Sequence, residues 1–187
     1  MIIVFIGPPF AGKDTQAAML SRKLSLPLFS MGALIREARK SGDKVISDAY
    51  NNYSLKGLHL PIDIKFGLLR NKIENLPNGF ILNNFPATKD DLGTFNKYLT
   101  EKNLNVYKVF FLNISKEEMQ KRLKNSSRKR KDDDSKIVLA RREVQDIDRV
   151  PVINYFRKLG ILEEINGEKD IDIVHKDILS RLGNNYD

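Results

Sequence analysis

The chain has 187 residues, of which 41% are hydrophobic and 30% charged, and it carries a formal net charge of +8, which is typical of one soluble globular domain. Because the sequence contains no cysteine, it excludes disulfide bonds and thiolate metal sites, so we expect no structural zinc. The first apolar run, residues 2–6, is only as long as one strand, and we therefore expect no signal peptide, no membrane-spanning helix and a cytoplasmic location.

The positive charge favours polyanionic partners, which include nucleic acids, acidic membrane surfaces and phosphorylated small molecules. Its densest part, the basic residues 128–131, is followed at once by three aspartates and has no interleaved aromatic side chains. Sites for single-stranded nucleic acid combine basic with aromatic residues, so we expect no nucleic-acid partner. Phosphorylated small molecules are the favoured ligands.

Short apolar runs alternate along the chain with longer segments of helical periodicity. The pattern predicts strands at residues 1–6, 27–30, 79–83, 106–112 and 161–165. It predicts helices at residues 13–24, 31–41, 44–54, 62–75, 89–102, 116–123, 136–159 and 171–182. Pro151 is expected to kink or divide the helix at 136–159. This alternation favours a three-layer α/β fold with a parallel sheet of about five strands, and the ligand site of such folds lies beyond the carboxyl ends of the strands.

The sharpest local signal is the segment GPPFAGKDT, residues 7–15, which follows the first strand and opens the first helix. A phosphate needs convergent backbone N–H donors, the positive end of a helix and a fixed cation, and the loop, the helix and Lys13 supply these three. The strict P-loop pattern fails, because Asp14 stands where a hydroxyl residue should follow the lysine and Thr15 comes one position later. The segment predicts a phosphate-binding loop.

With Gln16 included, this segment resembles the P-loop of adenylate kinases and UMP/CMP kinases, G-x-P-G-x-G-K-G-T-Q. Phe10 and Asp14 replace glycines of that pattern, and Phe10 matters only if its position needs a positive φ. Asp14 would repel a phosphate unless Mg²⁺ lies between them, so we expect a Mg²⁺ site at Asp14 and Thr15; otherwise Asp14 turns toward solvent or Lys23. The resemblance implies that ATP is bound by Pro9, Phe10, Ala11, Gly12, Lys13, Asp14, Thr15, Arg122 and Lys169.

The resemblance extends to the segments that hold the acceptor nucleotide. SMGALIR, residues 30–36, is similar to S-T-G-D-x-x-R; residues 57–63 to G-x-x-V-P-D-E; and NGFILNNFPAT, residues 78–88, to N-G-F-L-L-D-G-F-P-R-T. The acceptor residues that it implies are Met31, Gly32, Arg36, Leu58, His59, Leu60, Asn84, Phe85, Ala87 and Asp91.

Four positions in or next to these segments lack the functional residue of the family pattern. Met31 replaces a threonine, and Asn83 replaces the aspartate that orients Mg²⁺-bound water. Ala87 replaces an arginine that clamps the acceptor phosphate, and Asp91 replaces the glutamine that recognises adenine. The identity of the acceptor is therefore open at this point.

The polar residues 124–135 resemble the short form of the family's lid, without zinc ligands. The resemblance implies that Lys13, Arg130 and Arg141 are catalytic and that Arg122 packs on the donor base. It also implies one kinase domain over residues 1–187, with a helical NMP-binding insert at 30–61.

Three functions fit these residues. The first is a Mg²⁺-dependent monomeric adenylate kinase that converts ATP and AMP to two ADP. The second is a P-loop kinase for another nucleotide or small-molecule acceptor, and the third is a nucleotide-binding protein with little turnover. Retained phosphate clamps favour the first, because phosphoryl transfer needs mainly alignment and charge neutralisation.

Overall fold

The computed structural model describes residues 1–126 and 133–183. Its centre is a five-stranded parallel sheet in the order β2-β3-β1-β4-β5. The strands are β1 (Ile2–Ile6), β2 (Leu28–Ser30), β3 (Phe80–Asn83), β4 (Val106–Asn113) and β5 (Leu162–Asn166). The sheet of about five parallel strands predicted from the sequence is confirmed.

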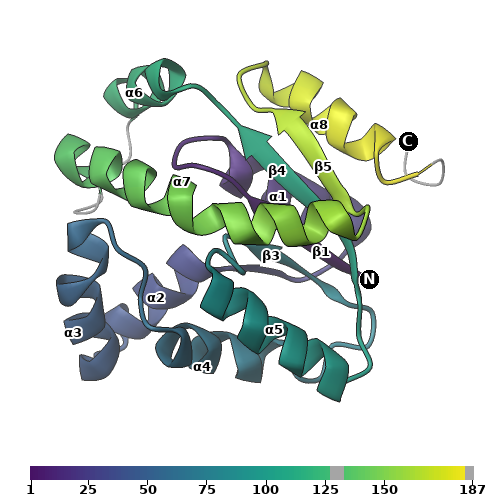
Figure 1. The fold of residues 1–187 in the computed structure, drawn as a ribbon, viewed down its shortest axis with the longest axis horizontal. Coiled ribbons are helices and arrows are strands. Elements are labelled where there is room, and N and C mark those ends of the chain that lie inside the picture. Colours follow the sequence, from purple (N-terminus) through teal and green to yellow (C-terminus); the bar gives the residue numbers. More distant parts are fainter. Residues whose placement is uncertain (127–132, 184–187) are drawn as a thin grey trace.

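Helices connect the strands and form the outer layers (Figure 1). They are α1 (Lys13–Leu24), α2 (Met31–Lys40), α3 (Lys44–Asn52), the 3₁₀ turn η1 (Ser54–Lys56), α4 (Ile62–Ile73), α5 (Lys89–Glu101), α6 (Lys116–Lys124), α7 (Ser135–Lys158) and α8 (Ile171–Ser180). The helices α2 and α3 and the turn η1 lie within residues 30–61, where an NMP-binding insert is predicted.

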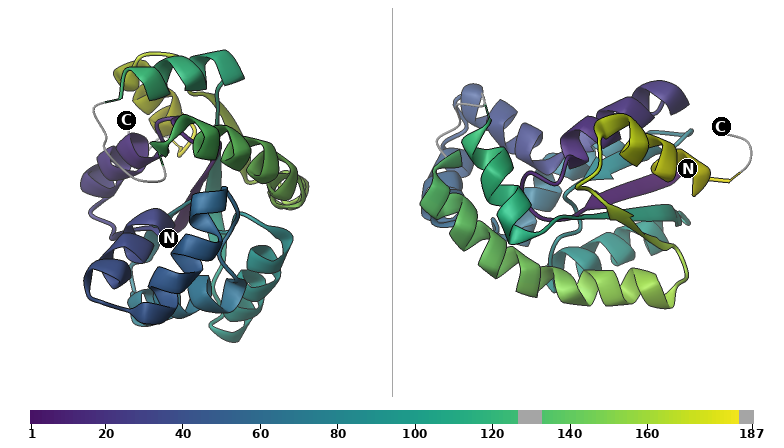
Figure 2. Two further views of the ribbon diagram at one scale, coloured as in Figure 1. Left: turned by 90° about the vertical axis from the view of Figure 1, so that its left-hand side faces the viewer. Right: turned by 90° about the horizontal axis from the view of Figure 1, so that it is seen from above.

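Alternate residues of β1 supply the two cores of the molecule. Ile2, Val4 and Ile6 pack on the side that carries α4, α5 and the second half of α7. Ile3 and Phe5 pack on the side that carries α1 and α8. Figure 2, seen from above, shows these two helical layers on opposite faces of the sheet, and the predicted three-layer fold is confirmed.

The helix α7 does not divide at Pro151; it runs unbroken from Ser135 to Lys158. A proline leaves the carbonyl four residues earlier without its helical donor, and here that carbonyl belongs to Ile147, which is 73% exposed. Water can satisfy the carbonyl on that face, so the helix continues past the proline.

Two further predictions concern membrane-spanning helices and the lid. Among the described residues, no helix has both the length and the apolar character needed to cross a bilayer. The predicted lid, residues 124–135, and the predicted catalytic residue Arg130 lie largely or wholly outside the described part of the chain.

Candidate functional site

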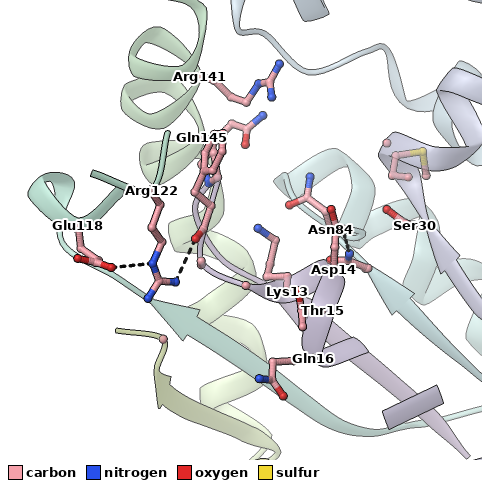
Figure 3. A pocket seen from close by; sticks show the side chains of 18 of the residues that line it. Lys13, Asp14, Thr15, Gln16, Ser30, Asn84, Glu118, Arg122, Arg141 and Gln145 are labelled. Atoms are coloured by element: carbon pink, nitrogen blue, oxygen red, sulfur yellow. Dashed lines mark hydrogen bonds and ion pairs between the residues drawn. The ribbon is translucent and has the colours of Figure 1, made fainter. Parts of the chain in front are cut away.

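A cavity of about 790 Å³ opens beyond the carboxyl ends of β1, β2 and β3. One wall, here called the α6–α8 wall, is formed by Phe10, by Arg122 of α6 and by residues 167–171 between β5 and α8. The opposite wall, the α2–α4 wall, is formed by residues of α2, the segment before α4 and the ends of β2 and β3. Figure 3 shows Lys13 and Thr15 between Arg122 on one side and Asn84 on the other.

The loop between β1 and α1 forms the floor of this cavity. Its last residue, Gly12, is the N-cap of α1 with a φ of 88°, and it has no side chain that could cover the first N–H groups of the helix. The Lys13 ammonium donates to the carbonyl of Pro8 at 2.7 Å, which holds it over the loop. Helix end, backbone and cation therefore converge as a phosphate site requires.

Phe10 stands in this loop with a φ of 61°, so its position does need the left-handed conformation that glycine adopts without strain. The cost for a residue with a side chain is about 1–2 kcal/mol. The Phe10 carbonyl accepts a hydrogen bond from Arg122 Nη1 at 3.2 Å, and its ring packs against the core on the α1 side. These contacts offset part of the strain.

Asp14 follows Lys13 at the start of α1 and accepts a hydrogen bond from Asn83 Nδ2 at 2.5 Å. Its partner is thus the end of β3, not Lys23. Asn83 is 1% exposed, and its Oδ1 has no hydrogen-bond partner among residues 1–126 and 133–183. The structure therefore places one carboxylate and one unsatisfied amide oxygen side by side near the phosphate loop.

The α6–α8 wall is held against the loop by close backbone packing. Gly167 would place a Cβ 2.9 Å from the carbonyl oxygen of Ala11, so any side chain there would push the two segments apart. Arg122 is oriented by Glu118, which accepts from its Nε at 2.7 Å (Figure 3). Lys169 also lines this wall.

The same wall is tied to α1 by Gln16, whose Nε2 donates to the carbonyl of Ile171 at 2.8 Å. Gln16 Oε1 lies 3.1 Å from Nδ1 of His175. His175 of α8 is partly buried against Gln16. Burial is also the main cause that lowers the pKa of His175.

The α2–α4 wall contains most of the predicted acceptor residues. Met31, Gly32, Arg36, Leu58, His59, Leu60 and Asn84 line the cavity. A Cβ on Gly32 would lie 3.1 Å from Nη1 of Arg36, so the glycine leaves room for the guanidinium.

Arg141 comes to the cavity from the first half of α7. Gly57, with a φ of 79°, would place a Cβ 2.7 Å from the backbone nitrogen of Arg141. The absence of a side chain at Gly57 thus allows the segment before α4 to lie directly on α7. It brings Arg141 to the same cavity as Lys13 and Arg36.

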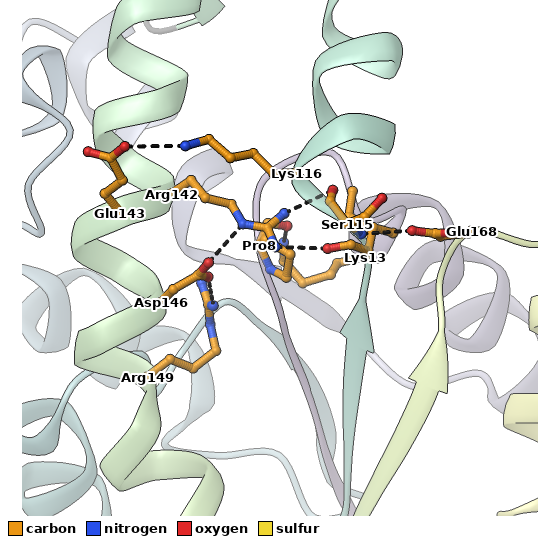
Figure 4. Close-up of polar contacts among 10 residues, drawn as sticks. Pro8, Lys13, Ser115, Lys116, Arg142, Glu143, Asp146, Arg149 and Glu168 are labelled. Atoms are coloured by element: carbon orange, nitrogen blue, oxygen red, sulfur yellow. Dashed lines mark hydrogen bonds and ion pairs between the residues drawn. The ribbon is translucent and has the colours of Figure 1, made fainter.

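Ion pairs within α7 and a hydrogen bond from α7 to the backbone after β4 fix the orientation of α7 (Figure 4). Arg142 donates to the carbonyl of Ile114 at 2.8 Å and to Asp146 at 2.8 Å. Asp146 also accepts from Arg149, which is 3% exposed, at 2.6 Å. This network supports the part of the helix that carries Arg141 and Gln145.

Three predicted acceptor residues lie behind the cavity wall, and the prediction of direct contact is corrected for them. Phe85 is 1% exposed and packs on Phe66 and Phe95, while Ala87 is 5% exposed. Asp91 has no exposed surface, because its carboxylate pairs with Lys65 and accepts the N–H of Ala87. None of the three lines the cavity.

Lys65 of α4, which the sequence did not single out, lines the cavity instead. The signal was a lysine between Ile64 and Phe66 in an apolar helical run, where a charged side chain needs a partner if it is buried. Gln145 and Glu118 are further lining residues that were not predicted.

His59 lies beside Lys65 with its side chain 13% exposed. Burial, and then the positive charge of Lys65, lower the pKa of His59 from 6.5 to about 4, and the Asp91 carboxylate opposes this shift. His59 is therefore neutral near pH 7.

Comparison with known proteins agrees with this geometry. The family model for adenylate kinase matches residues 5–161. The chain belongs to the adenylate kinase family. It is 30% identical to the adenylate kinase of Leptospira biflexa over 184 residues, which is 96% of this chain and 98% of that protein. It is 30% identical to the adenylate kinase of Archaeoglobus fulgidus, over 95% of this chain and 96% of that one. It is 32% identical to the adenylate kinase of Prochlorococcus marinus subsp. pastoris, over 96% of both chains.

The predicted function class is thereby confirmed: the chain is a nucleoside monophosphate kinase of the adenylate kinase family, a phosphotransferase with an α/β fold. Among the described residues, no group of three or more histidine, aspartate and glutamate side chains forms a metal cluster.

Proposed function

We propose that this adenylate kinase family member transfers the terminal phosphoryl group of ATP to AMP and releases two ADP. ATP binds along the α6–α8 wall and AMP along the α2–α4 wall. The observation that carries this proposal is the single cavity in which both walls meet at Lys13.

The chemistry asks little covalent work of the protein, because phosphoryl transfer proceeds through a loose transition state with charge spread over the phosphoryl oxygens. Lys13 and the N-terminus of α1 neutralise the charge on the ATP phosphates. Arg36 holds the acceptor phosphate through the forked donors of its guanidinium, and Arg141 supports the transferred group. Arg130, outside the described residues, is proposed as a second arginine at that group.

The donor nucleotide is proposed to contact the loop from Pro9 to Thr15 through its phosphates. Arg122 packs on its base, because Glu118 and the Phe10 carbonyl already orient the guanidinium next to the loop. Lys169 and the backbone around Gly167 complete this side.

Mg²⁺ is proposed as the cofactor, and the residues present fit it. Mg²⁺ prefers oxygen ligands and keeps several of its waters. Asp14 offers a carboxylate next to the phosphate loop, Thr15 a hydroxyl, and Asn83 an unsatisfied buried amide oxygen. When bound with ATP, the ion would neutralise phosphate charge in the transition state.

We further propose that the protein is a cytoplasmic monomer without a nucleic-acid partner, with an NMP-binding insert at residues 30–61 and a lid at residues 124–135. The acceptor half differs most from the family pattern at Met31, Ala87 and Asp91, so another acceptor is the second candidate.

A coupled assay of ADP release tests the reaction, with ATP, Mg²⁺ and each nucleoside monophosphate in turn. We expect AMP to be the best acceptor by kcat/KM. A different preferred monophosphate would support the second candidate, and no ADP with any acceptor, while ATP still binds, would contradict the proposal.

The Mg²⁺ site is tested separately by electron paramagnetic resonance, with Mn²⁺ in place of Mg²⁺ and ATP present. Asp14→Gly should weaken Mn²⁺ binding, and Asp14→Gly with Asn83→Asp should restore it, because the second change returns a carboxylate to the neighbouring strand end. Lys23→Ala on the same helix is the control and should bind Mn²⁺ as the wild type does. Unchanged binding in Asp14→Gly would contradict the role of Asp14.

A further inference from the structure

A buried ion pair closes the inner side of the α2–α4 wall. Lys65 Nζ of α4 lies 2.5 Å from Asp91 Oδ1 of α5, and the two side chains are 5% and 0% exposed. Placing two charges in such a setting costs several kcal/mol per ion in desolvation, and replacing the pair by packed apolar side chains is often neutral or stabilising. A role in stability alone therefore does not account for the pair.

Asp91 is held in place by the start of α5. Its backbone N–H donates to the Thr88 hydroxyl at 3.1 Å, and its own Oδ2 accepts the N–H of Ala87 at 2.9 Å. This reciprocal arrangement closes the helix N-terminus and fixes the carboxylate. Asp91 does not reach the main cavity, so it cannot contact a ligand there.

Lys65 does reach the cavity, and it also lines a second, smaller one of about 340 Å³. An ammonium group has three protons to donate. Asp91 is its ion-pair partner, and within residues 1–126 and 133–183 no hydrogen bond from Lys65 Nζ to another group is present. Lys65 is thus a nearly buried donor that lines a cavity and has protons without an acceptor among the described residues. Leaving such protons unpaired costs free energy, so an acceptor atom on a ligand would stabilise the group.

His59 gives independent support from the neighbouring side chain. Its Nε2 is buried, 3.7 Å from Asp148 Oδ2, and has no hydrogen-bond partner in the described part of the chain. Two adjacent polar side chains on the α2–α4 wall are thus both short of partners. Both residues line the main cavity on the α2–α4 wall.

The charge balance selects a neutral ligand atom rather than a phosphate. His59 is uncharged, and the Asp91 carboxylate cancels the charge of Lys65 and would repel an anion. The guanidinium groups of Arg36 and Arg141 line the cavity and offer better phosphate ligands. Lys65 therefore suits a lone pair on the base of the acceptor.

We propose that Lys65 recognises the acceptor base by donating a hydrogen bond to an unprotonated ring nitrogen, which is N1 in AMP, and that Asp91 is the positioning residue that aims Lys65 at it. This inference rests on the proposed use of AMP as the acceptor. In this proposal Lys65, held by Asp91, contacts the base, and Asp91 itself does not.

The test compares AMP with 1-deaza-AMP, in which a C–H group replaces N1. For the wild type we expect kcat/KM for the acceptor to fall about 10- to 100-fold with 1-deaza-AMP, as for the loss of a hydrogen bond from a charged donor. The variant Lys65→Met, Asp91→Asn removes both charges together and should treat the two acceptors almost equally. The KM for ATP should stay unchanged, which a general structural defect would not allow.

Asp91→Asn alone tests the positioning role. This variant should lower the ratio of kcat/KM for AMP to kcat/KM for 1-deaza-AMP, while the KM for ATP stays unchanged. The control is Lys72→Met, an exposed lysine on the same helix that pairs with Glu37, and it should keep the wild-type ratio.

Each outcome bears on a different claim. Equal kcat/KM values of the wild type for AMP and 1-deaza-AMP would overturn the contact with N1. If the double variant kept the wild-type ratio of these two values, a group other than Lys65 would make the contact with N1, and the proposal would be wrong. Should the double variant not fold, ligand-induced shifts in the melting temperature of the wild type decide, since AMP must stabilise it more than 1-deaza-AMP does. No turnover of either acceptor by the wild type would overturn the proposed function itself.

Discussion

In the proposed function each wall of the cavity holds one nucleotide, and the two walls are built in different ways. The α6–α8 wall uses backbone packing against the phosphate loop and an arginine that Glu118 and the Phe10 carbonyl orient. The α2–α4 wall uses a buried ion pair between Lys65 of α4 and Asp91 of α5. It also uses a neutral histidine, His59, from the segment between η1 and α4.

The donor side thus resembles the family pattern although its contacts join distant parts of the chain, as between Arg122 and Phe10. The acceptor side departs from that pattern at Met31, Ala87 and Asp91 and has its own chemistry.

The largest expected effect is on the floor that both walls share. Lys13→Ala should lower kcat about 10³-fold, because it removes a fixed positive charge from the developing transition state. Steady-state kinetics with saturating ATP and AMP measure it. Lys23→Ala, an exposed lysine of the same helix, should leave kcat unchanged; a small loss in Lys13→Ala would show that the floor is not where the two walls act together.

On the α2–α4 wall, breaking the ion pair from one side should cost stability. Lys65→Met alone leaves the Asp91 carboxylate buried without its counterion and should lower the free energy of unfolding by about 3–5 kcal/mol. Urea denaturation measures it. Adding Asp91→Asn should recover much of the loss; a Lys65→Met protein as stable as the wild type would mean that the pair is not desolvated as the structure has it.

The same wall should make stability depend on pH. The pKa of His59 is about 4 in the folded protein and 6.5 in the unfolded chain, so between these values the unfolded chain binds more protons. The contribution of His59 to the free energy of unfolding is therefore fully present above pH 6.5. It falls by about 3 kcal/mol as the pH drops to 4, because each pKa unit corresponds to about 1.36 kcal/mol.

Denaturation of the ligand-free protein at a series of pH values checks this. His59→Gln should remove most of the fall. His175→Gln should keep most of it, because His175 is less buried than His59 and its pKa is lowered less. An identical pH profile for the wild type and His59→Gln would contradict the buried, neutral state of His59.

For the α6–α8 wall, Arg122→Lys should raise the KM for ATP about tenfold, in line with the loss of one hydrogen bond from a charged group. The KM for AMP should not change, because Arg122 belongs to the opposite wall from the acceptor. Lys124→Ala, exposed on the same helix, serves as the control. Equal effects on both KM values would show that the two walls are not separate binding surfaces.

The smallest effect concerns the loop itself. Phe10→Gly relieves the strain of a left-handed residue but loses ring packing and gains chain entropy on unfolding, so the free energy of unfolding should change by less than about 1 kcal/mol. Phe10→Ala keeps the strain and loses the packing, and it should be the less stable of the two. Thermal denaturation of both variants checks the order.

Much of the fold could be predicted because each element carries its own signal. The helix α1 was predicted with the bounds that it has, and the other strands and helices were predicted within a few residues. The sequence left open whether α7 kinks or divides at Pro151, and the helix does not divide; the sequence does not show that Ile147, whose carbonyl loses its donor, is exposed. The contact between His175 and Gln16 joins two helices far apart in the chain, and no local signal predicts it.

At the site, the sequence predicted the phosphate loop with Lys13 and the segments that carry Arg36 and Arg141, and the structure brings these residues to one cavity. The loop was predictable because a short motif between a strand and a helix defines its own geometry. The sequence does not show that Asp91 is buried behind the cavity wall or that Lys65 lines the cavity; both follow from the packing of α4 on α5. The reason is physical: the two residues lie on different helices, and whether a charge is buried, paired or free to meet a ligand depends on what the fold packs against it.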